Sequence, residues 1–112
     1  MSRPATTTIT LEECDKHASE GDFWVVVETY VLDLSSFLQH HPGRARKIIQ
    51  KRKELGCDIT PNFLNHFGHT VRTFRQACQE FDRTQEPVSF DFQETANNKN
   101  APVVILGKIG SG

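Results

Sequence analysis

The distribution of apolar and polar residues along the chain predicts strands and helices within one small domain. Two short stretches rich in valine and aromatic residues, 23–27 and 30–32, are separated by two polar residues, a pattern typical of a β-hairpin. A third apolar stretch, 102–109, predicts a strand near the end of the chain. The residues between are rich in helix formers, so the pattern favours an α+β fold.

Five helices are predicted from their start and stop signals. Thr10 followed by Glu13 forms a capping box, which predicts a helix that ends near Gly21. Residues 44–55 are good helix formers, and Gly56 is a suitable C-terminal stop. The other three predicted helices begin after Asp33 or Ser35, at Thr60-Pro61, and just after His69.

The last of these helices carries one apolar stripe. Its apolar residues are spaced by three, four and three positions, so they share one face of the helix. We expect this face to pack into the core beside His69. The stripe consists of Val71, Phe74, Cys78 and Phe81.

Residues 82–101 form a polar segment that we expect to be an insertion before the last strand. Within it, only Val88, Phe90 and Phe92 alternate with polar residues in a strand-like way. The whole chain, 1–112, is expected to form a single domain, because a chain of this length buries one core.

Composition and charge argue against several classes of protein. The net charge is −1, so no basic field covers the chain and we expect no nucleic-acid binding. The longest apolar runs are far shorter than the roughly twenty residues of a membrane span, so we expect no membrane anchor. Three widely spaced cysteines without a Cys-x-x-Cys pair favour a reducing compartment, which we take to be the cytoplasm. We also expect the protein to be a monomer.

Two histidines stand at predicted breaks in the helical pattern. His41 precedes Pro42 and Gly43, and His69 follows Gly68. Proline cannot donate a helical hydrogen bond and glycine adopts backbone angles closed to other residues, so both histidines are expected at chain turns. A histidine at a turn can point into a cleft, although a His-Pro-Gly turn taken alone more often simply ends a helix.

The motifs around these histidines follow one another at a regular spacing. Trp24-Val25-Val26-Val27, the block 31–38 and His41-Pro42-Gly43 come first, and the distances between them match those of one known family without an insertion or deletion. Together with Gly68-His69-Thr70 and the closing strand 104–109, they resemble the cytochrome b5 family of small haem-binding domains. The resemblance extends over nearly the whole chain.

The resemblance implies an α+β fold in which a small mixed β-sheet forms the floor and pairs of short helices form a haem cleft. His41 and His69 would be the two axial ligands of the haem iron, and the lack of a Cys-x-x-Cys-His motif indicates a non-covalent b-type haem. The cleft wall is expected from apolar side chains close to the two histidines in sequence: Phe37, Ile48, Phe63, Phe67 and Phe74.

The second ligand has a competitor. The interval from His41 to His69 is a few residues longer than is usual in the family, so His66 lies closer to the customary spacing. We favour His69 because Gly68 precedes it and a threonine and an amphipathic helix follow it, as in the family's second ligand motif. Arg44 also stands where the family usually has glycine, but this change removes no ligand.

Two axial histidines would leave no open coordination position, so the resemblance implies a soluble one-electron carrier and not an enzyme. The family implies a flavin-containing NAD(P)H-dependent reductase as electron donor, and the acceptor is unknown. A run of cations on the predicted helix 44–55 favours a partner with an acidic docking face. These cations are Arg44, Arg46, Lys47, Lys51, Arg52 and Lys53.

Two alternatives from other classes stay open. The fold could serve as a haem-free or other-ligand-binding interaction module, which a failure to bind haem would reveal. His41, His66, His69 and Cys57 could instead supply nitrogen and sulfur ligands to zinc. The phenylalanine-rich surroundings favour a large flat ligand over zinc.

Overall fold

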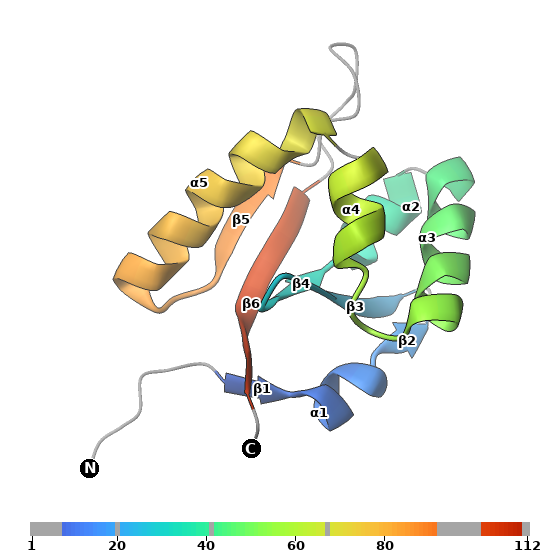
Figure 1. The fold of residues 1–112 in the computed structure, drawn as a ribbon, viewed down its shortest axis with the longest axis horizontal. Helices are drawn as coiled ribbons and strands as arrows, with labels where there is room; N and C mark the ends of the chain where they lie inside the picture. Colours follow the sequence, from blue (N-terminus) through green and yellow to red (C-terminus); the bar gives the residue numbers. More distant parts are fainter. Residues whose placement is uncertain (1–7, 20, 41, 67, 92–101, 111–112) are drawn as a thin grey trace.

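The computed structural model describes residues 8–19, 21–40, 42–66, 68–91 and 102–110 (Figure 1). These residues form one six-stranded sheet and five helices. The strands are β1 (Thr8–Thr10), β2 (Ala18–Ser19), β3 (Asp22–Val27), β4 (Tyr30–Asp33), β5 (Val88–Asp91) and β6 (Pro102–Gly110). The helices are α1 (Leu11–Asp15), α2 (Ser35–His40), α3 (Pro42–Leu55), α4 (Thr60–His66) and α5 (Gly68–Thr84).

The sheet is mixed, as predicted. Its strands follow the order β1-β6-β4-β3-β2, and β5 also pairs with β6. β1 runs parallel to β6, whereas the other strand pairs are antiparallel. The predicted hairpin is confirmed, because β3 pairs with β4 and Val26 lies opposite Val31. The combination of this sheet with five helices confirms the α+β fold class.

Apolar side chains pack on both sides of the hairpin. The larger cluster joins the sheet to α2, α3, α4 and α5 and includes Val25 and Leu32. The smaller cluster lies on the α1 side and includes Cys14, Val26 and Val31. Successive strand residues point to opposite faces, so the neighbouring residues Val25 and Val26 pack in different clusters. In Figure 1, α2 to α5 lie above the β3–β4 hairpin and α1 lies below it.

The first helix is much shorter than predicted. Thr10 caps α1 as expected, and its hydroxyl accepts a backbone hydrogen bond at 3.0 Å. The helix nevertheless ends at Asp15 and not near Gly21. The backbone N–H of Trp24 donates to the carbonyl of His17 at 2.9 Å, which places this part of the chain alongside β3. Pairing with the sheet therefore overrides the local preference for helix.

The other helix boundaries agree closely with the sequence. The Asp33 carboxylate accepts hydrogen bonds from the backbone N–H and the hydroxyl of Ser35, at 2.9 and 2.6 Å, at the start of α2. α3 ends at Leu55, and Gly56 follows with a φ of 88°, which glycine adopts without strain. α5 buries the apolar stripe predicted for it, except that Val71 is only half-buried. None of the described helices is long and apolar enough to cross a membrane.

The polar segment predicted at 82–101 contains regular structure in its described part. The end of α5 extends into it, and β5 then pairs antiparallel with β6. The strand-like alternation is confirmed at Val88 and Phe90, whereas Phe92 lies outside the described residues. The Phe90 ring is buried 6.1 Å from that of Phe74, so β5 contributes to the larger core.

Candidate functional site

Four of the five predicted wall residues meet in one buried cluster. Phe37 comes from α2, Ile48 from α3, Phe63 from α4 and Phe74 from α5, and none of the four is more than 2% exposed. The rings of Phe63 and Phe74 are in edge contact, with centroids 5.2 Å apart. Phe67 lies outside the described residues. Four helices therefore converge on one apolar region next to the sheet.

The sheet forms the floor of this region. Val25, Leu32 and Ile105 are fully buried in the same cluster. Tyr30 packs at its edge, and its hydroxyl donates to the Asp82 carboxylate at 2.8 Å. Burial raises the pKa of Tyr30, and the hydrogen bond to Asp82 raises it further, so the phenol stays neutral.

The ends of the four helices lie on one side of the molecule. Figure 1 shows the end of α2, the start of α3, the end of α4 and the start of α5 at the same upper side. His41 stands in sequence between α2 and α3 and lies outside the described residues. His66 is the last residue of α4 and His69 the second of α5, but the side chains of both fall outside the described part. The choice between His66 and His69 therefore stays a prediction.

Arg52 is a buried cation, so the prediction that it contributes to a basic docking surface on helix 44–55 is wrong. It is only 9% exposed. Its guanidinium donates to the carbonyl oxygens of Trp24 at 2.8 Å and Cys14 at 2.9 Å, and to the Sγ of Cys57 at 3.1 Å. The long aliphatic stem lets the charge reach these acceptors from the helix, and no sequence periodicity signals such contacts. Cys14 and Cys57 belong to the α1-side cluster, so this charge is held there by the polar atoms around it.

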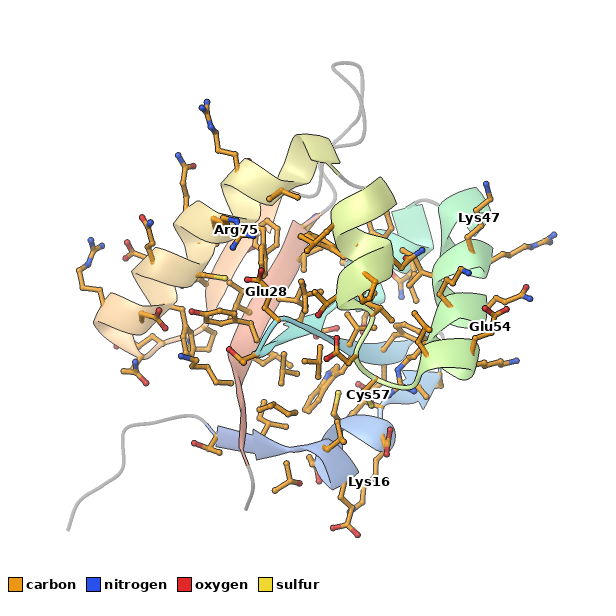
Figure 2. The ribbon with its side chains drawn as sticks, viewed as in Figure 1. Lys16, Glu28, Lys47, Glu54, Cys57 and Arg75 are labelled. Atoms are coloured by element: carbon orange, nitrogen blue, oxygen red, sulfur yellow. The ribbon has the colours of Figure 1, made fainter. Side chains whose placement is uncertain are left out.

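Cys57, labelled in Figure 2, connects Arg52 to α1. Its S–H donates to the Asp15 carboxylate at 2.7 Å. Burial raises the pKa of Cys57, and the bond to Asp15 adds to the rise. Burial also raises the pKa of the Cys14 thiol. Both thiols stay protonated, which is typical of unreactive structural cysteines.

His17 is held between two carboxylates on the α1 side of the sheet. Its Nε2 lies 2.9 Å from a Glu13 oxygen and its Nδ1 lies 2.6 Å from an Asp22 oxygen. Its ring stacks on Trp24, with centroids 3.6 Å apart. The hydrogen bond to Glu13 is the main cause that raises the pKa of His17 above its ordinary value.

This arrangement makes the stability of the α1 region depend on pH. Protonated His17 donates to both carboxylates, so its contribution is fully present below its unfolded pKa of about 6.5 and is lost as the pH rises through the raised folded value. We expect the melting temperature of the parent protein to exceed that of His17→Gln at about pH 6, and the difference to shrink by about pH 9. A difference that stays constant over this range would mean that stacking on Trp24, and not charge, carries the contribution.

The comparisons with known proteins place the chain in a family. A family model described as the cytochrome b5-like haem/steroid binding domain matches residues 10–82. Cytochrome b5 from Rattus norvegicus is 39% identical over 62 residues, which cover 55% of this chain and 43% of that protein. Cytochrome b5 from Bos taurus is 36% identical over 70 residues, covering 62% of this chain and 49% of that protein. No solved structure matches the chain significantly.

The similarity is confined to a module of these relatives. The chain spans about half the length of the cytochromes b5 that it matches. Nitrate reductase [NAD(P)H] from Hordeum vulgare is 37% identical over 59 residues, which cover 53% of this chain but only 6% of that protein. The family match includes the four described wall residues and the three candidate histidines, and it covers well over half of the sequence. On this basis the chain belongs to the family of cytochrome b5-like haem/steroid binding domains.

Proposed function

We propose that this domain binds one b-type haem through His41 and His69 and serves as a one-electron carrier. The observation that supports it best is the convergence of one buried apolar side chain from each of α2, α3, α4 and α5 on a single region. In sequence, His41 stands between α2 and α3, and His69 is the second residue of α5. Family membership supports the same non-covalent cofactor. We treat residues 1–112 as a single domain of this kind.

The described residues fit a flat apolar ligand. Three phenylalanines and Ile48 make this region aromatic and aliphatic in character, and the charge of Arg52 is satisfied on the α1 side. A haem bound there supplies the one-electron redox couple. The apolar side chains exclude water from the ligand, and their burial is one of the factors that set its reduction potential. Because no Cys-x-x-Cys-His motif occurs in the sequence, these contacts and the two histidines would hold the ligand without covalent bonds.

The proposed ligand set favours electron transfer over catalysis. With imidazoles from His41 and His69 at both axial positions, no position is left for oxygen or a substrate. The domain also occurs within a larger enzyme, as the match to the barley nitrate reductase illustrates. For this chain we propose the carrier role alone, with a flavin-containing NAD(P)H-dependent reductase as electron donor.

The family description favours one further candidate function. It includes steroid binding, so a haem-free module that binds another flat apolar ligand is the second candidate. The buried apolar lining suits either ligand. The histidines distinguish them, because an iron-free ligand has no need of two imidazoles.

A haem titration of the purified chain tests the proposal. We expect the absorbance to saturate at one haem per chain, with a low-spin spectrum that is recovered after reduction by dithionite and reoxidation by ferricyanide. Progesterone, used as the steroid probe, is expected not to compete with haem. Saturable binding of progesterone by a chain that binds no haem would support the second candidate and contradict the first.

A further inference from the structure

We propose that the outer surface of α3 is a docking surface for an acidic segment of a partner protein. We call this surface the basic face and define it by Arg46, Lys47 and Lys53, with Ile49 and Gln50 between them. The inference rests on the proposed function in one respect, namely that the partner is an electron donor or acceptor. The recognition chemistry itself follows from the described side chains and holds with or without a bound cofactor.

A groove on α3 gives the basic face its shape. It has a volume of about 470 Å³ and is lined by Arg46, Ile49, Gln50, Lys53 and Glu54. Ile49 is half-buried, whereas the two cations beside it are exposed. A groove with an apolar centre and cationic borders suits a peptide segment that carries carboxylates around an apolar residue.

The charge of the basic face is largely uncompensated. Glu54 is already engaged, because its carboxylate accepts from Lys51 at 3.4 Å and from Gln50 at 3.2 Å. Within the described part of the chain, no carboxylate pairs with Arg46, Lys47 or Lys53. Three exposed cations therefore remain available for an anionic partner.

The charge on this face stands out because the chain as a whole is slightly acidic, with a net charge of −1. Carboxylates gather instead near α1, where Glu12, Glu13, Asp15 and Asp22 lie. Figure 2 shows the labelled Lys47 on α3 at the upper right and the labelled Lys16 next to α1 at the bottom of the view. Such an asymmetric charge distribution orients an acidic partner as it approaches and raises the association rate at low salt.

The opposite side of α3 keeps the basic face in place. Ile48 is buried in the larger core, and Arg52, one turn later, is hydrogen-bonded to Trp24 and Cys14. The helix is therefore anchored on its inner side along two successive turns. An anchored helix presents its outer side chains without first having to order its backbone, which lowers the entropic cost of binding.

An acidic protein segment fits this face better than an anionic membrane does. Among the described cations of α3, Arg52 is buried and Lys51 is paired with Glu54, which leaves three on the basic face. Polybasic membrane-binding segments carry about four to eight Lys or Arg residues. The groove beside Arg46 and Lys53 also has the half-buried Ile49 in its lining, a feature that suits a side chain of a peptide segment better than lipid headgroups.

Binding of poly-L-glutamate tests the proposal, with the double variant Arg46→Glu/Lys53→Glu compared with the control Lys16→Glu/Arg83→Glu. Both variants change the net charge by the same amount at exposed positions, but the control lies on α1's C-cap and the end of α5. We expect the basic-face variant to weaken binding by about tenfold or more and the control by less than about twofold. Binding by the parent chain should also weaken as salt rises.

Two outcomes would overturn this inference. Equal weakening by the two variants would mean that net charge, and not the basic face, binds the peptide. Binding to vesicles of phosphatidylcholine and phosphatidylserine, lost in Arg46→Glu/Lys53→Glu, without binding to poly-L-glutamate would identify a membrane surface instead. Binding of poly-L-glutamate is measured on the haem-free chain as well as on the haem-loaded chain. Failure to bind the peptide is thereby distinguished from failure to bind haem.

Discussion

Alanine at His41 or at His69 is expected to abolish the six-coordinate low-spin haem spectrum. Each substitution removes one proposed iron ligand and leaves an axial position that water or no ligand occupies, which favours the high-spin state. Haem affinity should fall by more than the roughly 10- to 100-fold that the loss of an outer-shell partner typically costs a metal site. The visible spectrum reports the coordination state, and the rate of haem transfer to apomyoglobin reports the affinity.

His66→Ala and His40→Ala are the matched controls, because each neighbours a proposed ligand in sequence. Both variants should keep the low-spin spectrum and the slow haem transfer of the parent protein. The assignment of the second ligand is wrong if His66→Ala loses the spectrum while His69→Ala retains it. Circular dichroism of each haem-free variant checks that a lost spectrum does not reflect a lost fold.

The second large effect is expected from Phe63→Ala, which should lower the free energy of unfolding by about 3–5 kcal/mol. Phe63 is 1% exposed and its ring contacts that of Phe74, so truncation leaves a cavity between α4 and α5. Urea unfolding of the haem-free protein measures the loss. Because Phe63 is a proposed wall residue, Phe63→Ala should also increase the rate of haem transfer to apomyoglobin.

Phe81→Ala separates a wall role from a general packing role. Phe81 is also fully buried, but it lies further along α5, where its ring is 6.3 Å from that of Tyr30. Phe81→Ala should lower the free energy of unfolding by a similar amount to Phe63→Ala. Under conditions in which the variant is folded, its haem transfer rate should equal that of the parent protein. Phe63→Leu, which keeps most of the volume, covers the case in which Phe63→Ala does not fold. Equal haem transfer rates in Phe63→Leu, Phe81→Ala and the parent protein would mean that Phe63 does not line the haem site.

Local signals explain the parts of the fold that the sequence predicts well. The β3–β4 hairpin depends on two adjacent apolar stretches and a two-residue turn, and Glu28 in that turn adopts a φ of 62°. α2 begins at the predicted Asp33–Ser35 cap, and α3 ends at Gly56 as its stop signal indicates. In each case the deciding residues lie within a few positions of the boundary.

Contacts between distant parts of the chain explain what the sequence does not predict. α1 ends early because His17 pairs with Trp24 on the sheet, and β1 exists only because Ile9 lies opposite Ile109 of β6. Arg52 belongs to a helix that is predicted to be charged and exposed, yet two of its three hydrogen-bond acceptors are 28 and 38 residues away in the chain. Such pairings leave no periodic pattern in the sequence.

The sequence predicts the apolar residues of the candidate site better than it predicts the second histidine ligand. The family resemblance and their apolar type predict Phe37, Ile48, Phe63 and Phe74 as wall residues, and the structure brings these four into one buried cluster. Their role as the wall of a haem cleft stays a prediction. The same reasoning does not decide between His66 and His69 as the second ligand. His66 and His69 lie on either side of one helix junction, so spacing and local motif favour different residues.

The most direct test of the carrier role is the absorption spectrum of the reduced, haem-loaded protein before and after addition of carbon monoxide. With histidines at both axial positions, the split low-spin bands should be present after reduction and unchanged by carbon monoxide. A shift of the bands to those of a carbon monoxide complex would mean that the iron has an open position and that the proposed ligand pair is wrong.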